Sequence, residues 1–83
     1  YRELMMVKIR ANADQRESVH AVVQIFRASI VDVAKNSLTI MLTGDQKKLD
    51  ALLALLEEYE ILELARTGIT GLSRGAEDVR YLP

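Results

Sequence analysis

The fold is decided by the central stretch Ser29-Ile-Val-Asp-Val-Ala-Lys-Asn-Ser-Leu-Thr-Ile-Met-Leu-Thr43. β-Branched residues are frequent over Ser29 to Ala34, which predicts a strand. Apolar residues alternate with others over Ser37 to Thr43, so we expect a second strand with one apolar face there. Lys35-Asn36 between them predicts a two-residue turn, because asparagine tolerates the positive φ that tight hairpin turns need. The middle of the chain is therefore predicted to be a β-hairpin.

A strand and then an amphipathic helix are predicted on the N-terminal side of this hairpin. The strand spans Glu3 to Ala11. Asp14 is the expected N-cap of the helix, with Glu17 three residues later in the spacing of a capping box. The helix is expected to end near Arg27 or Ala28. Apolar residues recur along it at helical spacing and would form its buried stripe; they are Val19, Val22, Val23, Ile25 and Phe26.

A second helix and a last strand are predicted on the C-terminal side. Asp45 is the expected cap of a helix that ends near Glu58 or Tyr59, and its apolar stripe consists of Leu49, Leu52, Leu53 and Leu56. Ile61 to Ala65 or beyond predicts the fourth strand. The order β-α-β-β-α-β is that of a ferredoxin-like α+β fold, with a four-stranded, largely antiparallel sheet and two helices on one face. We expect one domain over residues 1–75 and a C-terminal tail over 76–83.

The two helices would leave the other face of this sheet uncovered. Alternation along the strands places Leu4 and Met6 on that face in the first strand, and Met41 in the third. Apolar faces of this kind commonly bind a partner. We therefore expect these three residues to contact another subunit, in a homodimer. The alternative is that the C-terminal tail folds over this face.

Composition and charge argue against several classes of function. The chain has 83 residues, a formal net charge of -1, no cysteine and one histidine. The charge argues against nucleic-acid and membrane partners, and no apolar run approaches the ~20 residues of a membrane-spanning helix. Thiolate metal sites are excluded, and His20 is interpreted as a solvated helix residue rather than a metal ligand or general base. We expect no catalytic site, metal or cofactor in this domain.

A basic segment punctuated by glycines follows the fourth strand. It begins Ala65-Arg66-Thr67-Gly68 and continues to Arg74-Gly75. Its glycines do not match a GxGxxG loop, and no helix pattern follows to bind a phosphate. Arg66 and Arg74 are therefore either exposed arginines beyond a strand or docking residues for a partner carboxylate. The candidate docking residues here are Arg66, Thr67, Gly68 and Arg74. We expect Arg66→Ala to weaken association more than it destabilises the fold.

Four runs of sequence occur in an order and spacing that point to one family. They are Glu3-Leu-Met-Met-Val-Lys-Ile, Val23-Gln-Ile-Phe-Arg-Ala-Ser-Ile-Val-Asp-Val, Leu38-Thr-Ile-Met-Leu-Thr-Gly-Asp-Gln-Lys-Lys-Leu and Ile61-Leu-Glu-Leu-Ala-Arg-Thr-Gly, with Arg74-Gly75 after them. Together they resemble the C-terminal domain of the small, regulatory subunit of acetolactate synthase (acetohydroxyacid synthase). Glu60 departs from that family, which usually has glycine before the Ile-Leu-Glu run, and this affects only the local turn.

The resemblance implies a non-catalytic role. Subunits of this family bind a large catalytic subunit that uses thiamine diphosphate, magnesium and FAD. They raise its activity and confer feedback inhibition by branched-chain amino acids, typically valine. The amino-acid site belongs to an N-terminal ACT domain, which is expected to lie outside this sequence. This domain would then contribute dimerisation and contact with the catalytic subunit, or with the ACT domain of the same subunit. The expected location is the cytoplasm, with a plastid or mitochondrial source left open.

Two other classes of function remain open from the residues themselves. A stand-alone sensing domain would hold a small molecule, such as an amino acid, on its sheet or at a dimer interface. A small enzyme is the other class, although the sequence offers no distinctive nucleophile motif for one.

Overall fold

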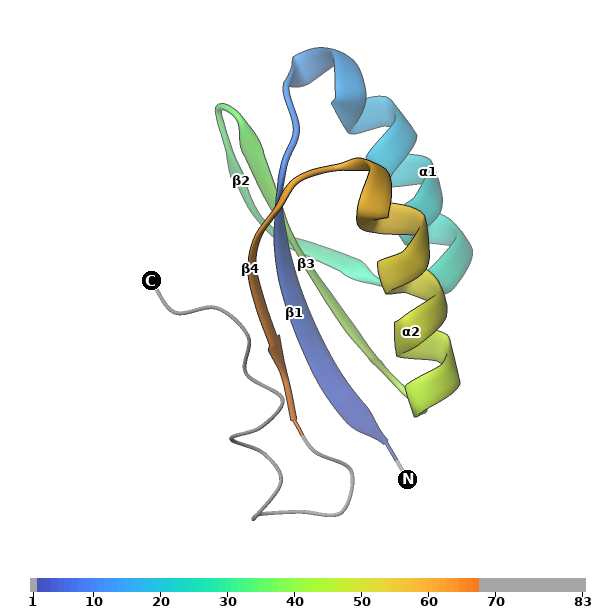
Figure 1. The fold of residues 1–83 in the computed structure, drawn as a ribbon. Coiled ribbons are helices and arrows are strands. Elements are labelled where there is room, and N and C mark those ends of the chain that lie inside the picture. Colours follow the sequence, from blue (N-terminus) through green and yellow to red (C-terminus); the bar gives the residue numbers. More distant parts are fainter. Residues whose placement is uncertain (1, 68–83) are drawn as a thin grey trace.

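Strands and helices alternate along residues 2–67, the part of the chain that this computed structural model describes. The strands are β1 (Glu3–Arg10), β2 (Ser29–Ala34), β3 (Ser37–Gly44) and β4 (Ile61–Arg66). The helices are α1 (Arg16–Phe26) and α2 (Gln46–Leu55), and short 3₁₀ turns lie at η1 (Ala13–Gln15) and η2 (Leu56–Glu58). The sheet has the order β2-β3-β1-β4, and every neighbouring pair is antiparallel. Both helices cover one face of it (Figure 1), which confirms the predicted ferredoxin-like α+β fold.

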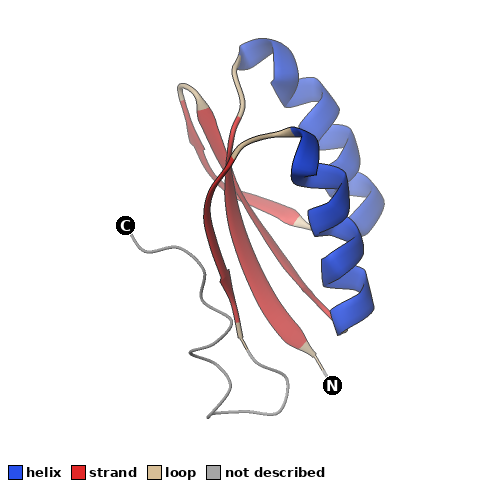
Figure 2. Cartoon of the chain, in the orientation of Figure 1, coloured by secondary structure: helices blue, strands red, loops and turns tan. Residues whose placement is uncertain are grey.

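The two helices form one layer against the sheet (Figure 2). The hydrophobic core lies between these two layers. Along β1, Met5, Val7 and Ile9 are fully buried on the helix side. The fully buried residues of the helical layer are Val19, Leu49, Leu52 and Leu56. Ile25 is 73% exposed, so its expected place in the buried stripe of α1 is wrong. Its position on the helix turns it away from the sheet, and a single exposed isoleucine is common on protein surfaces.

The turn of the β2–β3 hairpin has the predicted length of two residues, but its backbone conformation differs from the predicted one. Ala34 pairs with Ser37, so Lys35 and Asn36 form a two-residue turn. The expected positive φ at Asn36 is wrong, because Arg27 is the only non-glycine residue with positive φ among residues 2–67. Donors from outside the turn bind its carbonyl oxygens. The Arg16 guanidinium donates to Ala34 O (2.9 Å) and Lys35 O (3.1 Å), and the Ala11 N–H donates to Asn36 O (2.9 Å). These contacts hold the turn without a left-handed residue.

The first helical segment begins earlier than the sequence predicted. Asn12 is the cap, because its side chain accepts a hydrogen bond from Gln15 N (3.0 Å) and the Gln15 side chain accepts one from Asn12 N (2.9 Å). This capping box starts η1, which runs directly into α1, so the predicted box of Asp14 and Glu17 is wrong. Asp45 is confirmed as the cap of α2, since its side chain accepts a hydrogen bond from Lys48 N (2.8 Å).

The C-terminal end of α1 is closed by Arg27 in the left-handed conformation, with φ of 58°. Ala28 N donates to Val23 O (2.9 Å), and Arg27 N donates to Gln24 O (3.1 Å). This pair of bonds is the pattern of a Schellman motif, a position where glycine is the usual residue. The motif ends the helix within one residue and directs the chain into β2.

A candidate interaction surface on the uncovered sheet face

The face of the sheet opposite the helices carries a row of apolar side chains across three strands. Met6 on β1 pairs with Met41 on β3 and with Ala65 on β4, so the three residues lie side by side. Met6 is 40% exposed and Leu4, further toward the start of β1, is 38% exposed. The structure therefore places the three residues proposed from the sequence, Leu4, Met6 and Met41, on the uncovered face. An apolar row of this kind, bordered by polar residues, is typical of a protein–protein contact.

A polar row lies next to the apolar row, two residues further along β1. Lys8 pairs with Thr39 on β3 and with Glu63 on β4, and Thr39 pairs with Asp32 on β2. A hollow of about 140 Å³ between the two rows is lined by Met6, Lys8, Thr39, Glu63, Leu64 and Ala65. The uncovered face is thus divided into an apolar half near the start of β1 and a charged half near its end.

Arg10 and Glu60 complete the charged half at the end of β1. The Arg10 Nε donates to Glu60 Oε1 at 2.8 Å, and both side chains are more than half exposed. Within residues 2–67 this is the ion pair that links β1 to the segment preceding β4. Lys8 and Glu63, although directly opposite each other, form no ion pair within the described chain.

Thr67 extends the pairing of β4 with the start of β1. Its hydroxyl Oγ1 accepts a hydrogen bond from Leu4 N (2.9 Å), and its own N–H donates to Leu4 O (2.9 Å). Thr67 therefore fixes the backbone beneath the exposed Leu4 side chain. The other two predicted docking residues in this segment, Gly68 and Arg74, lie outside the described residues.

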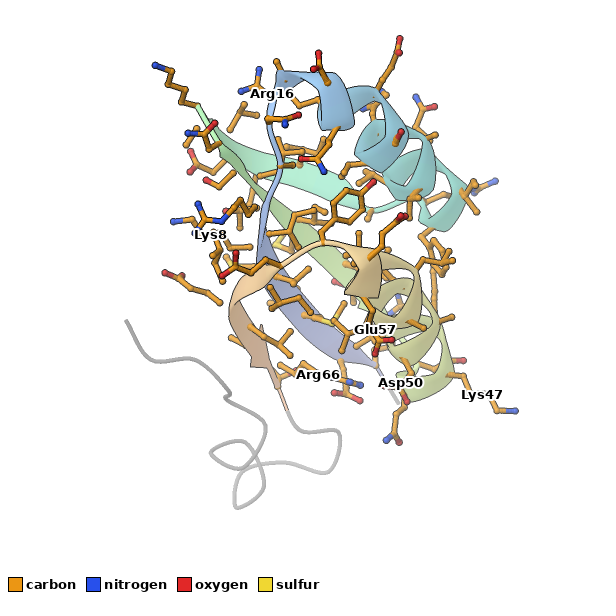
Figure 3. All side chains as sticks on the ribbon, turned by 45° about the horizontal axis from the view of Figure 1, so that its top comes forward. Lys8, Arg16, Lys47, Asp50, Glu57 and Arg66 are labelled. Atoms are coloured by element: carbon orange, nitrogen blue, oxygen red, sulfur yellow. The ribbon has the colours of Figure 1, made fainter. Side chains whose placement is uncertain are left out.

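Arg66 lies on the helix-covered side of the sheet, not on the uncovered face. Its Nη1 donates to Asp50 Oδ1 on α2 at 2.7 Å, and its Nε and Nη2 lie 3.4 Å from the carboxylate oxygens of Glu3 on β1 (Figure 3). The Arg66 side chain is 14% exposed and that of Glu3 is 4% exposed. Burial alone would lower the pKa of the Arg66 guanidinium, but the hydrogen bonds and negative charges of Asp50 and Glu3 outweigh it, so this pKa is raised.

These contacts give Arg66 a structural role within the domain. The guanidinium joins β4, β1 and α2 and supplies the positive charge beside a buried carboxylate. The expectation that Arg66→Ala affects association more than folding therefore loses its basis, because the side chain is neither exposed nor free for a partner. Docking through Arg66 stays a prediction that none of these contacts supports.

The helix-covered side also has a groove, between the start of α1 and the β2–β3 edge of the sheet. The groove is about 580 Å³, and its lining mixes apolar and charged residues: Ala13, Asp14, Arg16, Glu17, His20, Ile30, Val33 and Leu38. His20 is exposed at this place. Across residues 2–67, no three His, Cys, Asp or Glu side chains come together in a way that could hold a metal ion. Neither helix of that range has the length and apolar character needed to cross a membrane.

Three residues of the uncovered face were not among the contact residues predicted from the sequence. They are Lys8, Glu63 and Ala65. Lys8 follows from alternation along β1, because it is two residues beyond Met6 and therefore lies on the same face. The register of β4 was harder to foresee, because the pairing shifts between Lys8 and Ile9 and leaves Leu62 without a partner position on β1. Such a bulge can be located only when both strands are known.

Comparison with known proteins identifies similar chains along nearly this whole sequence. The family model for the small subunit of acetolactate synthase matches residues 2–75. The acetolactate synthase small subunit of Mycolicibacterium smegmatis is 46% identical over 78 residues, which cover 94% of this chain and 46% of that protein. The small subunit of Bacillus subtilis is 40% identical over 76 residues, 92% of this chain and 44% of that protein. This chain thus spans about half the length of these curated relatives.

A solved structure supports the same grouping. The crystal structure of the acetolactate synthase small subunit from Thermotoga maritima matches with a TM-score of 0.72 and 37% sequence identity. The match covers 81% of this chain and 41% of that one. Fold and sequence therefore agree on the same group of proteins.

Proposed function

Because this chain belongs to the family of acetolactate synthase small subunits, we propose that it is the C-terminal domain of a regulatory subunit and works by association rather than by catalysis. Its proposed partners are a second small subunit, the catalytic large subunit, and the N-terminal ACT domain of its own subunit. In this proposal the large subunit carries out the thiamine-diphosphate-dependent reaction of branched-chain amino acid biosynthesis. The domain itself would bind no cofactor.

The observation that carries this proposal is the uncovered sheet face. The row formed by Met41, Met6 and Ala65, with Leu4 beside it, exposes apolar area on the side of the sheet that neither helix covers. Removing such area from water is the dominant favourable term in most protein association. A face of this kind suits binding to a partner.

A regulatory domain changes an enzyme's activity only if it binds one state of that enzyme more tightly than another. The sheet is suited to this task because its rigid strands present the contact residues in fixed positions. The relatives named above are bacterial, which favours the cytoplasm over an organelle as the proposed location.

The proposal is tested by mixing the chain with the catalytic large subunit from the same organism. We expect the two to co-elute in size-exclusion chromatography, and we expect acetolactate formation to rise above that of the large subunit alone. The Met6→Glu variant should lose part or all of this effect, whereas Ile25→Glu, on the outer side of α1, should retain it. If wild-type chain neither co-elutes nor raises activity, contact with the catalytic subunit is not a function of this domain.

A further inference from the structure

The groove between the start of α1 and the β2–β3 edge of the sheet has the dimensions of a binding site. Its volume of about 580 Å³ falls within the roughly 300–1,000 Å³ that ligand sites usually occupy. Figure 1 shows the start of α1 and the β2–β3 turn at the same end of the molecule, and the groove lies there. From the sheet side, Leu38 at 2% exposure and Val33 at 55% exposure contribute apolar surface to it. An occupant of this groove would therefore cover apolar side chains.

The charges that this groove leaves unpaired are negative. Asp14 and Glu17 both line it and are exposed. Neither takes part in an ion pair or side-chain hydrogen bond of residues 2–67. Arg16 also lines the groove, but its guanidinium already donates to Ala34 O and Lys35 O in the hairpin turn. The groove therefore suits an occupant that combines a positive charge with apolar side chains.

The C-terminal residues of this chain have that combination. Val79-Arg80-Tyr81-Leu82 places one arginine among three apolar side chains. The family model ends at residue 75, so this segment is not part of the pattern that defines the family. Its chemistry is thus complementary to the groove, and its role is separate from the features that the relatives share.

We propose that the groove binds residues 79–82 of its own chain. The Arg80 guanidinium would lie beside the carboxylates of Asp14 and Glu17, where charge-assisted hydrogen bonds to their oxygens orient it. Burial of Tyr81 and its apolar neighbours against the sheet side of the groove supplies the favourable free energy. The uncovered sheet face stays free for the association proposed for it.

The chain between β4 and this segment is long enough for the contact. β4 ends at Arg66, which pairs with Met5, whereas the groove residue Leu38 pairs with Ile9, further along β1. The two points are roughly 20 Å apart, since they differ by about 13 Å along the strands and by about 14 Å from β4 to β2. Residues 68–79 can span up to roughly 40 Å when extended. This length allows a path around the edge of the sheet.

Covalent attachment allows even a shallow groove to be occupied. A short flexible tether holds a ligand at an effective concentration on the order of millimolar, so a groove with millimolar affinity for the free segment is substantially filled by the attached one. The competing position is the uncovered face. Its hollow is only about 140 Å³ and is lined by charges of both signs, Lys8 and Glu63. The groove is larger, and its unpaired carboxylates suit Arg80.

Disulfide formation within the full chain tests this placement, because the sequence has no cysteine of its own. Pro83→Cys is combined with Val33→Cys in the groove, with Lys8→Cys on the uncovered face, or with Ile25→Cys on the outer side of α1 as the control. Each variant is oxidised at low micromolar concentration, and cyclised monomer is separated from cross-linked dimer on a non-reducing gel. Because a disulfide needs Cα atoms within about 7 Å of each other, the rate of cyclisation reports where the segment lies.

We expect Val33→Cys with Pro83→Cys to cyclise on the order of tenfold faster than either other pair, because docking raises the effective concentration of the two thiols. Adding Arg80→Glu to this pair should reduce the rate to that of the Ile25→Cys control. Lys47→Glu makes the same change of charge at an exposed residue of α2 and should leave the rate unaltered.

Two kinds of result would overturn the proposal. Fastest cyclisation with Lys8→Cys would show that the segment lies over the uncovered face instead. Equal rates in the three pairs, or cross-linked dimer as the main product of the groove pair, would show that the segment does not occupy the groove of its own chain.

Discussion

Replacing Leu52 with alanine is expected to lower the free energy of unfolding by about 3–5 kcal/mol, the range seen for fully buried leucines. Leu52 lies on α2 with no exposed surface, within the core cluster between helix and sheet. The substitution removes buried apolar area and leaves a cavity that the rigid sheet cannot fill. A domain of this size has a stability of roughly 4–12 kcal/mol in total. The variant should therefore show a much lower urea midpoint by circular dichroism.

Leu55→Ala is the matched control for this prediction. Leu55 is on the same helix but is 48% exposed, so its truncation should change the free energy of unfolding by no more than about 0.5 kcal/mol. The comparison separates loss of core packing from any change in helix propensity, which is the same for the two substitutions. Similar losses in the two variants would contradict the assignment of the buried side of α2.

The second large effect is expected at Arg66, where methionine should lower the free energy of unfolding by about 3–5 kcal/mol. Methionine keeps much of the length of the side chain but removes the positive charge. The carboxylate of Glu3, which is 4% exposed, would then be left in the interior without a cation. Removing one member of a buried pair is costly because the other charge stays buried without compensation. This cost exceeds the net contribution of the intact pair to stability.

A double variant shows whether the cost comes from Glu3. Arg66→Met combined with Glu3→Gln should recover a large part of the lost stability, because the buried charge is removed along with its partner. Asp50→Asn should cost less than about 1 kcal/mol, since the Asp50 side chain is 56% exposed and exposed ion pairs contribute little. If Arg66→Met unfolds at the same urea concentration as wild type, Arg66 is not structural and its docking role regains support.

The uncovered face was predictable because strand alternation is a local signal. Every second residue of a strand points to the same side, so Leu4 and Met6 could be assigned to one face from the sequence of β1 alone. In the same way, helical spacing alone was enough to assign Leu49 and Leu52 to the buried stripe of α2. The same reasoning failed for Ile25, because the edge of a helical stripe depends on how far the neighbouring helix and sheet extend.

The environment of Arg66 could not be predicted in this way. Its partners Glu3 and Asp50 are 63 and 16 residues away in the chain. They meet Arg66 only because β4 pairs with β1 and α2 packs over that edge of the sheet. The hairpin turn is a similar case, since Arg16 and Ala11 bind its carbonyl oxygens from other elements. Local sequence therefore predicted the elements, whereas contacts between distant elements determined these two details.

Sedimentation equilibrium of the wild-type chain and of Met6→Glu tests most directly the claim that the uncovered sheet face is the association surface. We expect wild type to dimerise at high micromolar concentration and Met6→Glu to bind about 100-fold more weakly, because an unpaired charge would be buried in the contact. Ile25→Glu, which adds the same charge at a side chain that is 73% exposed on α1, should dimerise like wild type. A wild-type chain that stays monomeric at high micromolar concentration, or a Met6→Glu variant that dimerises as well as wild type, would contradict the account.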